Sequence, residues 1–460
     1  MALLIRGGEI VTADSRSRAD IYVENETITR IGPSLDAPAG TEIVDARGKL
    51  VFPGFIDPHV HIHLPFMATF AKDTHTTASV AALVGGTTCF IEMVCPSRNE
   101  DALAGYQTWK QKAEGHSACD YAFHMAVTRY DTSTEAQLRE IVKDGTASFK
   151  VFLAYKNFFG VTDDELFQTL TLAKSLGVIT TAHCENAELV GRLQQRLLSE
   201  GKTGSEWHEP SRPEPVEAEG TNRFAAFLEQ TGATGYVVHL SCQPALSAAV
   251  TAKLRGVRLY VESVLPHFLF DKTFAERKGV EGMKYVMSPP LRDKRNLDAL
   301  WSALEAGLID TVGTDHCPFD TEQKLMGKDN FTLIPNGIPG IEDRVNLMYT
   351  YGVARGRLDV HRFVDALSTQ PAKIFGLFPR KGNIAVGADA DLVIFDPSYR
   401  GTVSAKTQKT NNDYNGFEGY AIEGRASTVT VRGKVQVRDG AFVGSTSLGR
   451  MLRREPQYKA

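Results

Sequence analysis

The sequence contains no long hydrophobic run. Its richest apolar stretch, residues 78–95, is interrupted by glycines and threonines at 85–88, whereas a membrane-spanning helix needs about 20 consecutive apolar residues. The apolar run at the start of the chain ends at Arg6, too early for the hydrophobic segment of a secretory signal. We therefore expect a cytoplasmic protein with no membrane partner.

Cysteine is scarce, and charge of one sign is not in excess. The six cysteines form no CxxC pair, which favours reduced thiols over a disulfide framework or a zinc knot. The 51 Lys and Arg residues nearly balance the 55 Asp and Glu residues, and no basic stripe is present, so nucleic acid is not an expected partner. The 460 residues are 42% hydrophobic, with 40 glycines and 20 prolines, a composition that excludes disordered and fibrous proteins.

Short strand-like runs alternate with longer helical patterns over most of the chain. One predicted helix covers residues 163–176, because Thr162 and Glu165 form a capping-box pair and Gly177 supplies a stop. The Glu-, Pro- and Gly-rich stretch 201–220 is predicted to be a loop. Eight strand-like runs are present, at residues 51–57, 87–93, 120–128, 148–153, 178–184, 235–240, 258–264 and 310–315. Eight parallel strands close a barrel, so the prediction is an α/β protein with a (β/α)8 TIM-like catalytic barrel.

The two ends of the chain differ from the predicted barrel, residues 53–375. Residues 1–52 and 376–445 carry short alternating runs separated by Gly, Asn and Asp, which predicts hairpins. Neither end has enough strands to bury a face by itself, so we expect both to build one small β-sandwich beside the barrel. For the basic C-terminal tail, residues 446–460, the alternatives are a contact with a neighbouring subunit and a disordered end.

Ionisable side chains gather where the predicted barrel strands end, and the active sites of such barrels lie at that end. In the first run, His59 and His61 are two residues apart and so share one face of an extended chain. The fifth, sixth and eighth runs end in His183, His239 and Asp315. A single histidine on an apolar strand is most often a core residue, but this many together predict a metal site. Imidazole combined with carboxylate suits Zn, Mn or Co.

The fourth run carries one charged side chain, Lys150, within the sequence SFKVFLAY. An ammonium group inside a strand is costly, and neighbouring cations would lower its pKa toward the neutral amine. A neutral amine reacts with carbon dioxide, and the two oxygens of the resulting carbamate can bridge two metal ions about 4 Å apart. The alternative is an outward-facing Lys150 whose amine reaches solvent between the helices.

Together these motifs resemble the cyclic amidohydrolases, most closely the bacterial D-hydantoinases and dihydropyrimidinases. The resemblance extends over nearly the whole chain, through GFIDPHVHI, SFKVFLAYKNFFG, TAHCENAELV, MSPPLRDK, GTDHCPF, IPNGIPGIEDR and NNDYNGFEG. It implies two divalent metal ions per subunit, Zn with Mn or Co as alternatives, and a lysine carboxylated by carbon dioxide. The metal ligands that it implies are His59, His61, Lys150, His183, His239 and Asp315.

The resemblance also implies a reaction, the hydrolysis of the cyclic amide bond of hydantoins or 5,6-dihydropyrimidines to N-carbamoyl amino acids. A hydroxide that bridges the two metals attacks the ring carbonyl, and Asp315 acts as general base and then as general acid toward the departing nitrogen. For Asp315, metal ligation alone is the alternative. By similarity, Tyr155 donates to the oxyanion, with a packed aromatic ring as the alternative, and Ser288 and Asn336 bind the ring amide through their backbones.

Apolar residues next to the strand ends predict a specificity lid. Leu64, Phe152 and Phe159 stand where solvent exposure would otherwise be expected, and together they can cover a substituent on the substrate ring. Packing against a neighbouring loop is the alternative for any one of them.

Three other functions remain open within this resemblance. A dihydroorotase typically has an arginine two residues after the second histidine, where this chain has His63, and an allantoinase has an acidic loop that this sequence lacks after His61. A non-catalytic dihydropyrimidinase-like scaffold characteristically loses metal ligands, but all six are present. We assign His63 to loop packing, and His267 and His316 to the cavity border, with no partner assigned to either. The resemblance implies a homodimer or homotetramer.

Overall fold

Eight parallel strands form the barrel, which is continuous except at one seam. In this computed structural model, which describes residues 2–156 and 158–458, the strand order is β15-β14-β13-β12-β11-β10-β9-β6. Each predicted run overlaps one strand, and the bounds are β6 (Phe55–Val60), β9 (Thr87–Val94), β10 (Asp120–Ala126), β11 (Ser148–Phe152), β12 (Ile179–His183), β13 (Thr234–Val237), β14 (Leu259–Val264) and β15 (Thr311–Gly313). The prediction of a (β/α)8 barrel is confirmed.

The first predicted run needs a correction, because the structure divides it between two sheets. Residues 51–53 belong to β5 (Leu50–Pro53) of a neighbouring sheet, and the barrel strand begins at Phe55. Gly54 lies between them, and a Cβ atom there would be 2.0 Å from Oγ1 of Thr88. Only glycine allows the chain to pass this close to the barrel as it changes sheets.

Hydrogen bonds outside the regular ladder join β6 to β15 at the seam. Asp57 accepts hydrogen bonds from the backbone N of Thr314 at 3.1 Å and from its Oγ1 at 2.6 Å. The backbone N of His61 donates to the carbonyl oxygen of His316 at 2.8 Å. The segments that follow the two strands therefore lie side by side, although more than 250 residues separate them in the sequence.

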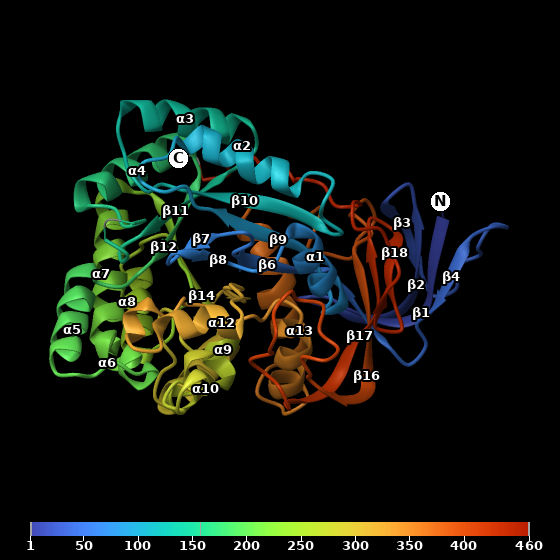
Figure 1. Cartoon of the computed structure of the whole chain (residues 1–460). Coiled ribbons are helices and arrows are strands. Elements are labelled where there is room, and N and C mark those ends of the chain that lie inside the picture. Colours follow the sequence, from blue (N-terminus) through green and yellow to red (C-terminus); the bar gives the residue numbers. More distant parts are fainter. Residues whose placement is uncertain (1, 157, 459–460) are drawn as a thin grey trace.

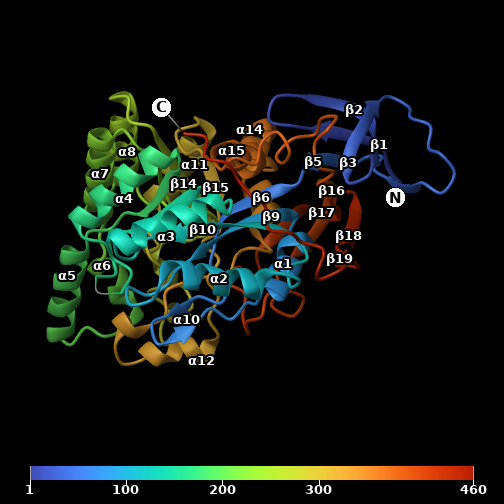
Figure 2. The ribbon, with the colours of Figure 1, turned by 90° about the horizontal axis from the view of Figure 1, so that it is seen from above.

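Helices cover the outside of the barrel (Figure 2). α4 spans Asp163–Leu176 as predicted, with the Thr162–Glu165 capping box and with Gly177 in the left-handed conformation. Further helices are α1 (His75–Val84), α2 (Ala102–Ala113), α3 (Thr132–Lys143), α5 (Ala187–Ser199), α8 (Gln243–Leu254), α9 (Leu265–Leu269), α10 (Val280–Met283), α11 (Arg295–Glu305), α12 (Thr321–Lys324), α13 (Arg344–Met348), α14 (Val360–Val364) and α15 (Gln370–Ile374). Among the described residues, no helix is both long and apolar enough to cross a membrane.

The predicted loop over residues 201–220 is wrong in its second half. α6 (His208–Ser211) and α7 (Glu214–Thr231) lie there instead. Pro215 looked like a loop residue in the sequence, but it occupies the first turn of α7, where a backbone N–H has no helical partner in any case.

The two ends of the chain meet in one sheet of nine strands beside the barrel, where the β-sandwich was predicted. Figure 1 shows the blue N-terminal strands next to the orange and red C-terminal ones. The junction is β5, which pairs in parallel with β1 and antiparallel with β16. The sheet encloses its own apolar cluster. Its strands are β1 (Ala2–Val11), β2 (Arg16–Glu24), β3 (Thr27–Gly32), β4 (Glu42–Asp45), β5, β16 (Leu392–Thr402), β17 (Ala421–Val431), β18 (Lys434–Arg438) and β19 (Ala441–Phe442).

The C-terminal segment runs along the amino-terminal ends of the barrel strands. The backbone of Leu452 donates to Tyr121 at 2.7 Å, and the backbone of Tyr458 donates to Gly177 at 2.9 Å. The guanidinium of Arg454 is buried there and donates to Ser148 Oγ at 2.9 Å. The alternative of a disordered tail is therefore wrong for residues 449–458, and a contact with another subunit stays a prediction.

Candidate metal centre

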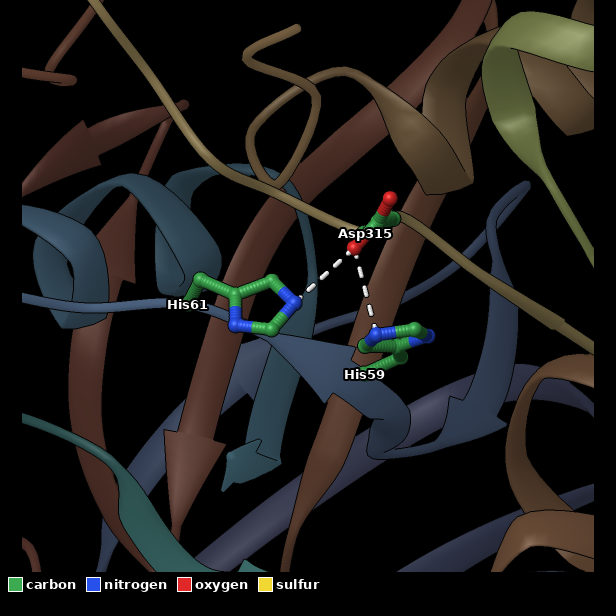
Figure 3. A group of neighbouring side chains, drawn as sticks. All are labelled: His59, His61 and Asp315. Carbon is green, nitrogen blue, oxygen red and sulfur yellow. Dashed lines mark ion pairs between the residues drawn. The ribbon is translucent and has the colours of Figure 1, made fainter. Parts of the chain in front are cut away.

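Three side chains from the barrel seam converge on one point (Figure 3). His59 lies in β6, His61 follows that strand, and Asp315 follows β15. The Nε2 atoms of His59 and His61 each lie 3.1 Å from Oδ1 of Asp315. Burial alone would raise the pKa of Asp315, but the two neighbouring histidines outweigh burial and lower this pKa. An ionised carboxylate therefore faces two imidazole nitrogens.

A second histidine pair lies beside the first. His183 is the last residue of β12, and His239 follows β13, the neighbouring strand. Nδ1 of His183 is 2.9 Å from Nε2 of His239, and the rings of His59 and His239 are 5.4 Å apart. The four histidines predicted as ligands thus form one continuous group.

Lys150 points into the same cavity from β11. Its side chain is fully buried, and it lines the cavity together with His61, His183, His239 and Asp315. The alternative of an outward-facing lysine is therefore wrong. Its Nζ has no hydrogen-bond partner among the described residues, and burial lowers its pKa to about 8. At neutral pH the neutral fraction of this amine is therefore far larger than that of an exposed lysine, and carbamate formation requires the neutral form.

The donor set fits two divalent cations. Histidine ligates a metal in its neutral form, and burial lowers the pKa of His59 and His239 well below the usual value. Besides Lys150 Nζ, the buried Nε2 of His59 makes no hydrogen bond in the described part of the chain, because its 3.1 Å contact with Asp315 lacks hydrogen-bond geometry. Buried polar atoms without partners are rare, and a bound cation would satisfy these atoms. The nitrogen and oxygen donors are of the kind that suits Zn, Mn or Co.

Glu262, in β14, supports this centre and was missed by the sequence analysis. Its Oε1 lies 2.8 Å from Nδ1 of His59 and accepts the backbone N–H of His239 at 3.0 Å, while Oε2 accepts from Tyr236 OH at 2.7 Å. A carboxylate at Nδ1 leaves Nε2 free to bind a metal and sets the orientation of the ring. The only signal in the sequence is an acidic residue inside the apolar run LYVESV.

A second buried carboxylate, Glu185, supports His183 in the same way. Its Oε2 lies 2.6 Å from Nε2 of His183 and 2.5 Å from the guanidinium of Arg212. Burial opposes ionisation of Glu185, but Arg212 and His183 outweigh burial and hold its pKa at about 2. The arginine also lies over the ring of Tyr155, at 5.4 Å from the centroid. Arg212 lies 29 residues after His183 in the chain, and no motif in the sequence predicted that it belongs to this site.

The predicted substrate residues line the cavity next to the metal ligands. Tyr155, Ser288 and Asn336 all face it, and Nδ2 of Asn336 donates to Oγ of Ser288 at 2.9 Å. Burial raises the pKa of Tyr155 to about 12, so its hydroxyl stays protonated and remains a donor at neutral pH. The structure therefore brings all three together with the ligand group.

The predicted lid residues lie on the wall of the same cavity. Leu64, Phe152 and Phe159 are buried, and the rings of Phe152 and Phe159 stack at 5.2 Å. Phe66, in the hairpin of β7 (Pro65–Phe66) and β8 (Thr69–Phe70), stacks on Phe159 at 6.0 Å. The aromatic wall thus combines residues that follow two different barrel strands.

An outer chamber adjoins this cavity and shares Phe66, Tyr155 and Asn336 with it. Aromatic and apolar side chains share its walls with several polar ones. Its remaining lining residues are Met67, Phe158, Gln194, His208, Arg212, Phe331 and Thr332. No motif in the sequence marked Gln194, Arg212, Phe331 or Thr332.

Three residues of the site adopt a left-handed backbone conformation that non-glycine residues rarely take. The φ angles are 57° for Tyr155, 41° for His239 and 50° for Asp315. Each costs about 1–3 kcal/mol and persists only where the surrounding structure holds it. Strain of this kind is typical of functional sites, and here it is found at two candidate metal ligands and at Tyr155.

The remaining histidines near the cavity differ from one another. The ring of His63 packs 5.7 Å from the ring of His75, as expected for a loop residue. His316, to which the sequence assigned no partner, has two, because its Nε2 lies 2.8 Å from Asp73 Oδ2 and its Nδ1 accepts the backbone N–H of Gly340. Within the described part of the chain, neither ring nitrogen of the buried His267 has a hydrogen-bond partner.

Known proteins resemble this chain over its full length. A model of the Amidohydrolase family matches residues 50–435. The D-hydantoinase of Geobacillus stearothermophilus is 41% identical over 456 residues, or 99% of this chain and 97% of that protein. The dihydropyrimidinase of Dictyostelium discoideum is 39% identical over 99% of this chain and 91% of its own. A solved structure of a D-hydantoinase (dihydropyrimidinase) from a Thermus species is 76% identical, covers 99% of this chain and 100% of its own, and has a TM-score of 0.98.

Proposed function

The chain belongs to the amidohydrolase family, and we propose that it opens the rings of hydantoins and 5,6-dihydropyrimidines by metal-dependent hydrolysis of a cyclic amide bond. The products are N-carbamoyl amino acids. The observation that carries this proposal is the convergence, at one end of the barrel, of the six residues His59, His61, Lys150, His183, His239 and Asp315.

These six residues are assigned to hold two divalent cations, Zn with Mn or Co as alternatives, with Lys150 as its carbamate. When bound, the cations supply a nucleophile at neutral pH and polarise the attacked carbonyl group. The ring nitrogen is a poor leaving group and must be protonated. Asp315 faces the cavity, so it can accept the proton released on attack and deliver it to that nitrogen.

Three residues are assigned to the ring itself. The protonated hydroxyl of Tyr155 donates to the oxyanion that forms on attack, a contribution of typically about 10²-fold or more in rate. The backbone groups of Ser288 and Asn336 bind the amide edge of the ring. Hydantoin and dihydrouracil share this edge, which supports activity on both rings.

The outer chamber is assigned to the substituent on the ring. The aromatic side chains that line this chamber favour rings with an apolar or aromatic substituent over an unsubstituted ring. Phe159 lines the adjoining cavity and stacks on Phe66, which lines both spaces. We expect Phe159→Ala to change the relative kcat/KM among 5-substituted hydantoins by about tenfold, while unsubstituted hydantoin is affected less. A substrate profile equal to that of the wild type would remove Phe159 from the lid.

A dihydroorotase-like preference for an anionic substrate is less well supported. That activity needs a cation near the second histidine, and the ring of His63 instead packs against His75. Burial lowers the pKa of His63 to about 4, so its side chain is neutral at physiological pH.

The decisive experiment is ring opening by chelator-stripped protein before and after the addition of Zn or Mn. Ring opening of hydantoin and dihydrouracil is followed by the loss of their ultraviolet absorbance. We expect the stripped protein to be inactive on both rings and added metal to restore the activity. Two bound metals per chain without activity on either ring would point to another cyclic amide, such as allantoin. Failure to bind metal would favour the non-catalytic scaffold.

Two further assignments accompany the function. A cytoplasmic location is supported by the six cysteines, which are all free and buried. The oligomer is assigned as a homodimer or homotetramer, and analytical ultracentrifugation tests it.

A further inference from the structure

Three backbone carbonyl groups converge on one buried ammonium group behind the substrate cavity. Lys324, at the end of α12, is fully buried. Its Nζ donates to the carbonyl oxygens of Val286 at 3.0 Å, Pro335 at 2.7 Å and Gly337 at 2.8 Å. An ammonium group has three N–H donors, so these acceptors use all of them.

These carbonyl groups flank the two residues that we assign to the ring amide. Pro335 and Gly337 stand on either side of Asn336, and Val286 precedes Ser288 by two positions. The segments 286–288 and 335–337 are also joined by the backbone bond from Gly337 N to Val286 O, at 2.9 Å. A side-chain bond of 2.9 Å links Asn336 to Ser288. The lysine therefore binds both segments at their crossing.

The surroundings of Lys324 indicate positioning rather than charge pairing. No carboxylate forms an ion pair with it among the described residues. Burial lowers the pKa of its amine, and the three carbonyl acceptors oppose this by favouring the ammonium form. An apolar side chain of the same length would leave the carbonyl groups of Pro335 and Gly337 without a donor, and Val286 with only the N–H of Gly337. Buried acceptors that lose their donor are costly, so the two segments would shift to find others. The backbone of Gly337 is packed closely against Cys317, since a Cβ atom at Gly337 would lie 2.3 Å from the carbonyl oxygen of Cys317. A shift of this segment would therefore disturb its contact with Cys317.

We propose that Lys324 is a positioning residue for the substrate ring. It holds the segments 286–288 and 335–337 at a fixed separation, so that the backbone groups of Ser288 and Asn336 bind the ring amide together. This inference rests on the proposed function. Lys324 acts on the part of the substrate that every ring shares, so its loss weakens binding by the same factor whatever the substituent.

The test compares Lys324→Met with Lys328→Met, an exposed lysine one turn further along the chain. In K324M we expect KM to rise about tenfold or more on both hydantoin and dihydrouracil, as the loss of charge-assisted hydrogen bonds predicts, with kcat changed much less. Metal content measured by mass spectrometry stays at the wild-type value. In K328M all three quantities stay at the wild-type value.

A double-mutant cycle separates positioning from a general structural effect. The KM effect of K324M becomes smaller in an Asn336→Ala background, because that variant has already lost the side-chain bond between the segments. It keeps its full size in a Phe159→Ala background, because the aromatic wall acts on the substituent. Equal effects in both backgrounds, or a wild-type KM in folded K324M, overturn the proposal.

A third variant keeps the test valid if K324M does not fold. Lys324→Gln retains two donors, so KM is expected between the wild-type and K324M values, and circular dichroism reports whether each variant is folded. A folded K324Q with the KM of the wild type overturns the proposal. Wild-type protein that binds two metals but opens neither ring refutes the proposed function instead, which separates the two failures.

Discussion

Two buried lysines at opposite ends of the barrel have different surroundings. At the amino-terminal end, Nζ of Lys381 lies 2.6 Å from Asp120, 2.6 Å from Asp391 and 3.0 Å from Asp389. At the carboxyl end, Nζ of Lys150 has no hydrogen-bond partner within the described residues. The carboxylates around Lys381 outweigh burial and raise its pKa, whereas burial lowers the pKa of Lys150 to about 8.

This difference separates a structural charge from a reactive one. Lys381 joins the barrel to the nine-stranded sheet, since Asp120 begins β10 and Asp391 precedes β16, and its donors are satisfied within the chain. A buried amine whose donors are not satisfied is costly to the fold and is retained where an external group completes it. Lys150 fits the second description, and in the proposed function carbon dioxide and metal ions are the external groups that would complete it.

The largest expected effect comes from removing the reactive lysine. Lys150→Met should lower kcat/KM on hydantoin by on the order of 10³-fold or more, because neither metal-bridging carbamate nor neutral amine remains. Metal content should fall below two ions per chain, while the melting temperature of the stripped protein falls little or rises. Lys143→Met, an exposed position on α3, is the matched control. A K150M protein that binds both metals and keeps full activity would show that Lys150 is not the reactive lysine.

Removing the structural lysine should act on stability instead. Lys381→Met leaves three carboxylates without their shared cation, and breaking a buried ion pair typically costs about 3–5 kcal/mol in the free energy of unfolding. Chemical denaturation measures this loss, with the exposed Lys434→Met as control. The fraction that remains folded should keep its metals and its kcat. A variant with normal stability but lost activity would reverse the two roles.

A supporting carboxylate at the metal end should have an intermediate effect. Glu262→Gln keeps the shape of the side chain but removes the carboxyl group beside Nδ1 of His59. Burial raises the pKa of that carboxyl group to about 7, so its charge in the wild type is partial at neutral pH. Loss of such a partner typically weakens metal binding by about 10–100-fold. Competition with a chelator measures the affinity, and Glu276→Gln, an exposed position, is the control. Unchanged affinity would mean that the histidine rings are oriented without this carboxylate.

The smallest effect is a pH dependence of metal uptake by the stripped protein. Because the pKa of Lys150 is about 8, acid converts the amine to ammonium and blocks carbamate formation. Below that pKa, each pH unit reduces the neutral fraction about tenfold, so uptake should speed up as the pH rises toward 8 and then level off. Dissolved carbon dioxide must be held constant. A rate independent of pH would show that the amine is not the titrating group.

The sequence was sufficient for features that depend on residues close together in the chain. The capping box of α4 involves Thr162 and Glu165, and the strand runs are marked by local alternation with helices. Four of the residues assigned as metal ligands, His59, His61, His183 and Asp315, lie at or just beyond strand ends, where the known geometry of a barrel places active sites. The order of residues along the chain is therefore enough to locate these four positions.

Contacts between distant residues could not be found in this way. Glu262 lies 203 residues from His59, and only the closing of the barrel brings its carboxylate to the imidazole. Lys324 likewise has no signal at the sequence level, because its three acceptors are backbone groups of two other segments. The loop predicted over 201–220 was wrong because Pro215 serves equally well in a loop and in the first turn of a helix.

The sequence by itself determined the architecture and the chemistry of the ligand set, since strand and helix periods, caps and residue types are local properties. The tertiary structure alone decided which of the buried charges are satisfied. Burial and long-range pairing set the different pKa values of Lys150 and Lys381, and both arise only when strands far apart in sequence close around them. The sequence alone therefore cannot tell whether a buried lysine is structural or reactive, because its neighbours are set by the tertiary structure.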